Sequence, residues 1–261
     1  MSKELIQGAA DDGLISIQSL QSIQNFNLGA QIQAGLGTFV DDLPITESAL
    51  FASIVDNSGS INGIKGGQES VCAGQNLYLD TLRGSKNQGV MVGQWLINQK
   101  EPLHGFLPVE EAHNLVVGLN YSAAGDTWLY YQTFAVLSTI VAKIQEFSDA
   151  GVPSRAVLCI ITDGRDEDYT HAGNRVSAKN VSNLINDLRE NLLVFFMGIA
   201  GNEDFHEIAK AMGIQKQFVL TPGDDEHELR KAFEMVSRSS LQVSQQGQAG
   251  FSNVQAGGFT D

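Results

Sequence analysis

Three short segments of this chain are rich in side-chain oxygen atoms. The first reads DNSGS, in which Asp56, Ser58 and Ser60 alternate along the chain. In an extended turn, alternate side chains point to the same side, so these three oxygens can converge. The second segment reads GDT and ends at Thr127, and the third reads TDG and is centred on Asp163. Together, the five residues offer two carboxylates and three hydroxyls to a ligand.

This set of donors predicts a site for a hard divalent cation. Carboxylate, hydroxyl and water oxygens favour Mg²⁺, Mn²⁺ or Ca²⁺, whereas zinc and copper sites are typically built from His and Cys. Neutral hydroxyls leave the ion under-neutralised, and Mg²⁺ keeps exchangeable water that an incoming carboxylate can replace. We therefore expect Mg²⁺, with Mn²⁺ and Ca²⁺ as alternatives.

The elements around these segments indicate how the oxygens come together. Apolar runs typical of strands cover residues 49–56, 89–97, 156–162, 192–199 and 217–220, and segments of helical period separate them, chiefly 127–147 and 176–189. This alternation predicts a three-layer α/β/α, Rossmann-like fold with a mostly parallel central sheet. In such a sheet, ligands bind beyond the carboxyl ends of the strands, where strand order reverses. With the strand order 3-2-1-4-5-6, Asp56 and Asp163 would end neighbouring strands.

Composition divides the chain into three parts. Residues 1–43 are rich in Gln, Ser, Asn and Gly without a sustained period, which indicates an N-terminal extension. Residues 44–240 form the expected domain. Residues 241–261 combine Gly, Gln and Ser with few apolar anchors, which predicts a mobile tail.

The three oxygen-rich segments resemble the metal-ion-dependent adhesion site of von Willebrand factor A domains, and all five family positions are filled. The likeness extends from roughly Pro44 to Ser240 and includes GDTWLYYQTFAVL, which is similar to a Gly-Thr-Pro-Leu-Tyr stretch of bacterial members. The resemblance implies that Ser58, Ser60 and Thr127 coordinate the ion directly or nearly so. It implies that Asp56 and Asp163 bind it directly or through water. It also implies ligand binding rather than catalysis.

The sequence departs from the family pattern beside Thr127. Asp126 stands where Gly is usual, and we expect it to cap the following helix, with a place in the outer shell of the metal as the alternative. Trp128 replaces a common Pro and is expected to pack, or else to rim the metal face. The acidic run 166–168 is expected to be a solvated charge run, or else to select a basic-rimmed partner.

Charge and length exclude several classes of function. The net charge of -14 opposes binding to nucleic acid or to an anionic membrane, which requires clustered Lys and Arg. No apolar run approaches the length that spans a bilayer, and the start of the chain lacks the pattern of a signal peptide, so a cytoplasmic protein is expected. Only two cysteines are present, and a disulfide framework is not expected.

Enzyme alternatives lack necessary residues. IVDNSGS superficially resembles the nucleophile loop of dehalogenase-type phosphatases, with Asp56 as nucleophile, but Ser58 stands where a second carboxylate is needed as general acid. His206-Glu207 lacks the second His of a metalloprotease. We therefore expect a binding module and no catalytic activity.

The resemblance also suggests two kinds of partner. In one version, the chain is an intracellular scaffold or regulatory subunit, similar to the stand-alone bacterial A domains found with tellurium-resistance-type stress systems or with AAA+ ATPases, and the missing export signals favour it. A surface adhesion module is the alternative. In both cases, the expected partner is a protein that offers a carboxylate to the metal.

Overall fold

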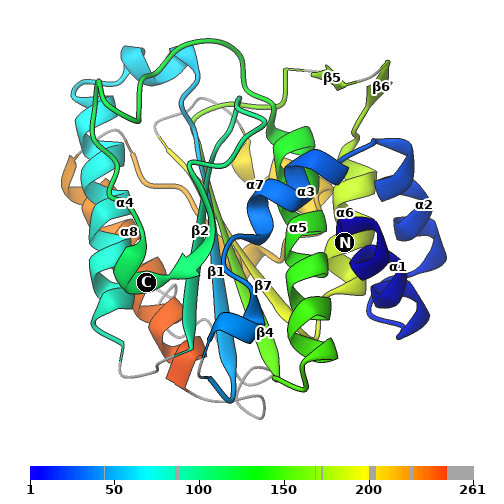
Figure 1. Cartoon of the computed structure of the whole chain (residues 1–261). Helices are drawn as coiled ribbons and strands as arrows, with labels where there is room; N and C mark the ends of the chain where they lie inside the picture. Colours follow the sequence, from blue (N-terminus) through cyan, green and yellow to red (C-terminus); the bar gives the residue numbers. More distant parts are fainter. Residues whose placement is uncertain are drawn as a thin grey trace.

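The computed structural model describes residues 1–43, 45–85, 89–167, 169–171, 173–199, 204–223 and 226–245. At its centre lies a six-stranded sheet with the order β3-β2-β1-β4-β7-β8 (Figure 1). Its strands are β1 (Ser48–Val55), β2 (Val90–Leu96), β3 (His104–Pro108), β4 (Ser154–Thr162), β7 (Leu192–Gly198) and β8 (Val219–Leu220). A separate hairpin is formed by β5 (Thr170–His171) and β6 (Asn174–Arg175).

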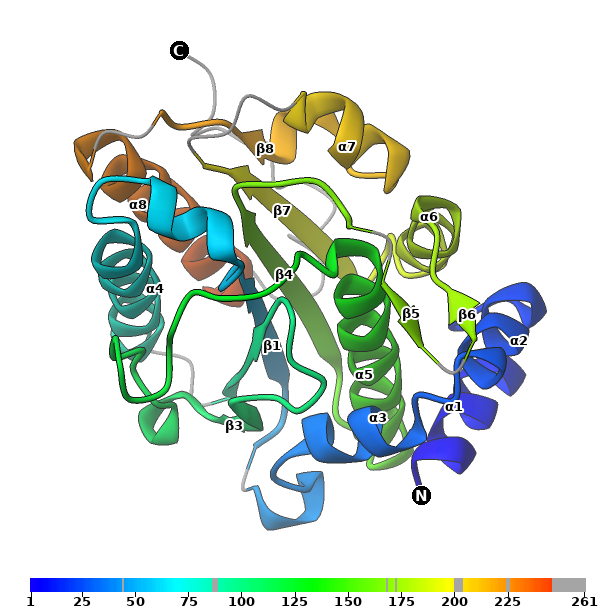
Figure 2. The same cartoon turned by 90° about the horizontal axis from the view of Figure 1, so that it is seen from above.

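Helices cover both faces of this sheet, which confirms the predicted fold class (Figure 2). One face is covered by α4 (Gly67–Arg83) and α8 (Glu226–Gln245), and the other by α5 (Leu129–Asp149) and α6 (Ala178–Asp187). The short helix α7 (Phe205–Ala211) lies beside β8. Short 3-10 helices occupy Val40–Asp42, Gly59–Gly63, Val109–Glu111 and Lys216–Phe218.

The strand order places β1 and β4 side by side. Strand β1 pairs in parallel with both β2 and β4, and β4 pairs in parallel with β7. Apart from the small hairpin, this is the 3-2-1-4-5-6 order under which Asp56 and Asp163 were expected to end neighbouring strands. The sequence did not reveal β3, which pairs antiparallel to β2. This five-residue segment contains Gly105 and ends at Pro108, and both residue types are depleted in strands.

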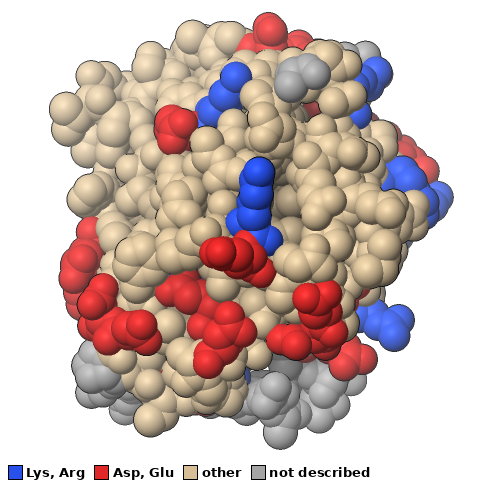
Figure 3. Space-filling model, turned by 45° about the vertical axis from the view of Figure 1, so that its right-hand side comes forward, with Lys and Arg blue, Asp and Glu red and all other residues tan. Residues whose placement is uncertain are grey.

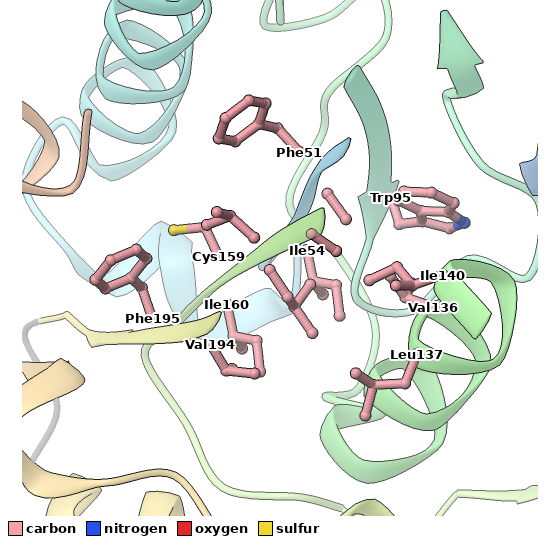
Figure 4. Close-up of a cluster of buried hydrophobic side chains, with 14 of the residues drawn as sticks. Phe51, Ile54, Trp95, Val136, Leu137, Ile140, Cys159, Ile160, Val194 and Phe195 are labelled. Atoms are coloured by element: carbon pink, nitrogen blue, oxygen red, sulfur yellow. The ribbon is translucent and has the colours of Figure 1, made fainter. Parts of the chain in front are cut away.

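The central strands are buried on both faces, so their apolar runs are continuous rather than alternating. Figure 4 shows Ile54, Ile160 and Val194 on the side of α5, where Val136, Leu137 and Ile140 meet them. Phe51, Cys159 and Phe195 point to the opposite side of the sheet. Cys72 and Cys159 are both buried free thiols. In the described residues, no helix combines the length and hydropathy needed to cross a bilayer.

The expected N-terminal extension is ordered as three helices: α1 (Ser2–Asp11), α2 (Ile17–Asn25) and α3 (Gly29–Leu36). Helices α1 and α3 pack on α5, and α2 packs on α6. Phe26 makes an edge-to-face contact with Phe134 of α5, with 5.4 Å between the ring centroids. The extension therefore forms an outer layer over the domain.

The C-terminal boundary differs from the expected one at residue 241, because α8 continues to Gln245. Leu and Gln are good helix formers, so this end of the helix is compatible with its composition. The rest of the predicted tail, residues 246–261, lies outside the described residues.

Candidate metal centre

The first and third oxygen-rich segments lie next to each other at the carboxyl end of the sheet. Asp56 directly follows β1, and Asp163 directly follows β4. The backbone N–H of Asp56 donates to the carbonyl of Ile161 (2.9 Å), which continues the pairing of the two strands. The prediction that these two carboxylates end neighbouring strands is thus confirmed.

Two hydrogen bonds hold the Asp56 carboxylate in place. The backbone N–H of Ser58 donates to Oδ1 (2.7 Å), and the hydroxyl of Thr162 donates to Oδ2 (2.6 Å). Asp56 is completely buried. Thr162 therefore has a positioning role that the sequence did not reveal, since only its neighbour Asp163 was expected to face the site.

Hydroxyl groups connect the two segments. The hydroxyls of Ser58 and Ser60 lie 2.9 Å apart, and Ser60 donates to Oδ1 of Asp163 (2.8 Å). Ser58 is buried and Ser60 is exposed. Four of the five predicted ligands thus form one connected group that opens to solvent at Ser60.

Thr127, the fifth predicted ligand, lies against the third segment. Its side chain is buried, and a β-carbon at Gly164 would stand 3.5 Å from its hydroxyl oxygen. This places the Thr127 hydroxyl next to the residue that follows Asp163. Helix α5 begins at Leu129, so Thr127 precedes the helix rather than opening it.

Backbone hydrogen bonds join the first and second segments. The N–H of Gly59 donates to the carbonyl of Gly125 (2.9 Å), and the N–H of Ala124 donates to the carbonyl of Asn57 (2.8 Å). Gly125 adopts φ +79°, a left-handed conformation that glycine adopts without strain. The side-chain amide of Asn98 donates to the carbonyl of Ala124 (2.7 Å) and supports the same turn.

The third segment is joined to the second by acidic residues. Oε2 of Glu167 accepts a hydrogen bond from the N–H of Thr127 (2.7 Å), and the N–H of Glu167 donates to the Thr127 carbonyl (2.9 Å). Oδ1 of Asp166 accepts from the N–H of Tyr130 in the first turn of α5 (2.9 Å). Negative charge is favourable at a helix N-terminus, where backbone N–H groups lack partners.

These contacts correct two expectations. The prediction of a solvated charge run is wrong for Asp166, whose side chain is only 4% exposed, and Asp168 lies outside the described residues. The capping role expected of Asp126 is taken by Asp166, because the residue at the N-cap is Trp128 and Asp126 is exposed. The sequence could not reveal this cap, since 36 residues separate Asp166 from Tyr130.

Trp128 packs, as expected, but in a half-buried aromatic cluster beside the site. Its ring stacks on Tyr169, with centroids 3.9 Å apart, and lies edge-on to Tyr131. Tyr131 also meets His171 of the β5–β6 hairpin. The cluster therefore fixes the segment after Asp163 against the start of α5.

The electrostatics of the site favour a cation. Burial raises the pKa of Asp56, although hydrogen bonds from Ser58 and Thr162 act in the opposite direction. Burial and the nearby Asp56 carboxylate raise the pKa of Asp163 to about 6. A positive charge between the two buried carboxylates would offset their desolvation and mutual repulsion.

The oxygen-donor groups of the site fit a hard cation, and most of them are hydroxyls rather than carboxylates. Within the described part of the chain, no cluster of three or more His, Cys, Asp or Glu side chains could hold a metal ion. An ion at this place would therefore depend on the hydroxyls of Ser58, Ser60 and Thr127 as well as on the two carboxylates. Such a set of oxygen donors is compatible with the expected Mg²⁺.

Comparisons with known proteins bear on the fold. No protein-family model matches the chain, and no curated protein matches its sequence. Solved structures do match. Proximal thread matrix protein 1 from the mussel byssus, with a zinc-occupied MIDAS motif, is 14% identical over 75% of this chain and 46% of its own, with a TM-score of 0.51.

Two bacterial structures match this chain with similar sequence identities and TM-scores. The pilus adhesin SpaC from Lactobacillus rhamnosus GG is 11% identical over 77% of this chain and 30% of its own, with a TM-score of 0.52. The vWF domain of the type V pili tip protein Mfa5 from Porphyromonas gingivalis is 11% identical over 78% of this chain and 98% of that domain, with a TM-score of 0.50. The chain spans less than half the length of the mussel protein and of SpaC.

The fold of this chain is that of a von Willebrand factor A domain. At the level of fold, this confirms the resemblance seen in the sequence.

Proposed function

We propose that the chain is a metal-dependent protein-binding module that engages an acidic group of a partner protein. The observation that carries this proposal is the hydrogen-bonded group of Asp56, Ser58, Ser60 and Asp163 at the carboxyl end of the sheet. Thr127 completes the group from the loop before α5. These five residues would hold one divalent cation, for which we favour Mg²⁺ over Mn²⁺ and Ca²⁺.

In this proposal, the protein fixes one carboxylate and leaves one side of the site exposed. Thr162 and the backbone N–H of Ser58 orient Asp56, so its carboxylate is fixed before a ligand arrives. Ser60, the exposed member, leaves the site open toward solvent. The bound ion would supply a Lewis-acidic centre at which a partner carboxylate can replace water.

The chain has a net charge of -14, and its acidic side chains are unevenly distributed on the face that Figure 3 shows. On the face that Figure 3 shows, most Asp and Glu side chains lie in the lower half of the molecule. The carboxyl ends of the parallel strands lie at the top in this orientation. That end itself carries Asp56, Asp163 and the exposed Asp126, so in this proposal the bound cation is what attracts an acidic group there.

Two kinds of partner follow from the same site. A cytoplasmic scaffold or regulatory subunit, bound to an AAA+ ATPase or to a component of a stress system, is the version that the sequence favours. The adhesins among the similar structures favour a surface adhesion module. A phosphatase-like hydrolase that uses Asp56 has less support, because Asp56 is buried and both of its carboxylate oxygens already accept hydrogen bonds.

Calorimetry of metal-stripped protein tests the proposal. We expect saturable binding of Mg²⁺ to the wild type and its loss in Asp56→Ala and Ser58→Ala, because both variants remove donors of the connected group. Asp126→Ala is the matched control: this residue adjoins Thr127 but is exposed, and we expect its binding to stay within about twofold of wild type, as for an ordinary surface change. Equal binding by all four proteins would place the metal elsewhere, and no binding by the wild type would remove the basis of the proposal.

A further inference from the structure

An exposed apolar turn lies in the loop between β3 and α5. Three of its residues are large hydrophobic side chains with much of their surface in water: Val116 is 46% exposed, Val117 is 38% exposed and Leu119 is 81% exposed. Single exposed aliphatic residues are common and need no explanation. Three of them within four residues form a patch, and such patches frequently mark protein interfaces. We call residues 116–121 the apolar turn.

The backbone of the apolar turn is well ordered. The N–H groups of Leu119 and Asn120 both donate to the carbonyl of Val116 (3.1 and 3.2 Å), and the N–H of Gly118 donates to the carbonyl of Tyr121 (2.9 Å). The side chain of Asn120 accepts from the N–H of Val116 (2.7 Å). A turn held in this way loses little conformational entropy when a partner covers it.

The apolar turn is also attached to the candidate metal centre. The hydroxyl of Tyr121, a buried residue, donates to the backbone carbonyl of Asp56. Three residues later, Ala124 donates to the carbonyl of Asn57. The loop rises along α4 and then crosses the carboxyl end of the sheet to reach α5 (Figures 1 and 2). The turn and the candidate ligand Thr127 therefore belong to one continuous loop, which is hydrogen-bonded to the segment that carries Asp56.

The middle part of the loop, residues 112–125, is uncharged, which suits it to close contact with another protein. Residues 112–125, AHNLVVGLNYSAAG, include no Asp, Glu, Lys or Arg. The buried centre of a protein interface is typically depleted of charged residues. The carboxylates of the loop, Glu110, Glu111 and Asp126, lie outside this uncharged stretch.

We propose that the apolar turn is a second contact of the metal-dependent interface, in which Leu119 enters an apolar pocket of the partner. The partner is then a folded protein that presents an acidic side chain to the metal centre and an apolar pocket next to it. This inference rests on the proposed function, because the metal supplies the first contact. The two contacts would explain how a metal site recognises a particular protein surface.

Site-specific photo-crosslinking tests this inference on the full chain. p-Benzoylphenylalanine is placed at position 119, at position 126 beside Thr127, or at position 17, where an exposed Ile on α2 provides a matched control away from the loop. Each protein is irradiated in an extract of the cells from which the chain derives, with Mg²⁺ or with excess EDTA. We expect positions 119 and 126 to label the same protein only with Mg²⁺, and position 17 not to label it.

The outcomes separate this inference from the proposed function. Metal-dependent labelling at position 126 without labelling at position 119 overturns the inference and leaves the proposed function in place. Labelling that EDTA and Asp56→Ala leave unchanged contradicts both, and so does the absence of labelling at positions 119 and 126. EDTA removes the metal without changing any of the predicted ligand residues, so the comparison with and without EDTA remains valid even where Asp56→Ala fails to fold.

The labelled protein, once purified, allows an affinity measurement. Leu119→Ser should weaken its Mg²⁺-dependent binding about 10- to 100-fold, the factor that corresponds to burial of one Leu side chain. Ile17→Ser should leave the affinity unchanged. A Leu119→Ser variant that binds as tightly as wild type overturns the inference.

Discussion

At Asp163, burial and the neighbouring Asp56 carboxylate act in the same direction, and both raise its pKa. Ser60 donates a hydrogen bond to this carboxylate but does not compensate for the loss of water. The site therefore holds negative charge at a cost to the metal-free fold. A cation would remove that cost, which is the physical reason to expect metal binding and stability to be linked.

This linkage predicts a pH dependence for the metal-free protein. The folded-state pKa of Asp163 is about 6, above the ordinary value of 3.8, so its contribution to stability is full below pH 3.8 and is lost as the pH rises through 6. In EDTA, the melting temperature of the wild type should fall relative to that of Asp163→Asn between pH 4.5 and 7.5. Added Mg²⁺ should raise the wild-type melting temperature more at pH 7.5 than at pH 5. Parallel melting curves for the two proteins in EDTA across this range would contradict the prediction.

At the scale of elements, the start of α5 depends on the loop after β4. Asp166 caps the N–H of Tyr130, and Glu167 binds the N–H of Thr127. Because Thr127 is a candidate ligand, the residues that cap the helix also set the position of its hydroxyl. Helix start and metal centre are thus one structural unit.

Replacing the cap tests this unit. Asp166→Ala should lower the free energy of unfolding by about 1 kcal/mol, the usual cost of a lost N-terminal cap, and should also weaken Mg²⁺ binding. Asp126→Ala, three residues before the helix, should change the free energy of unfolding by less than about 0.5 kcal/mol. Urea unfolding with and without Mg²⁺ measures both effects. The opposite ranking of the two variants would show that Asp126, not Asp166, is the cap.

At the scale of the whole molecule, the N-terminal helices are tied to the domain by a buried ion pair. Nζ of Lys143 on α5 lies 3.0 Å from a carboxylate oxygen of Glu146 and also donates to the carbonyl of Thr38. Oε1 of Glu146 accepts from the N–H of Val40 (2.8 Å). The backbone of the segment after α3 is therefore hydrogen-bonded to two charged side chains that have little access to water.

Breaking this pair should destabilise the whole chain. Glu146→Ala leaves the buried Lys143 charge without its partner, so we expect a loss of about 3–5 kcal/mol in the free energy of unfolding. The double variant Lys143→Met with Glu146→Leu should recover part of that loss, because no unpaired charge is left behind. Urea unfolding measures both. A double variant no more stable than Glu146→Ala would show that the pair acts through packing rather than charge.

The sequence alone determined the order of the candidate ligands and the elements that carry them. Continuous apolar runs at 49–56 and 156–162 indicated strands buried on both faces, and Asp56 and Asp163 stood at their ends. Both signals are local in the chain, since they depend on residue type and spacing. That is why the fold class and the place of the five oxygen donors could be predicted.

The tertiary structure decided which residues support that site. Thr162 reaches Asp56 across 106 positions of sequence, and Asp166, rather than the nearer Asp126, caps α5. It also decided that residues 1–43 pack as helices, although their composition indicated only an extension. Partners such as these are set by distances between chain segments that folding brings together, and no local pattern of residue types records those distances.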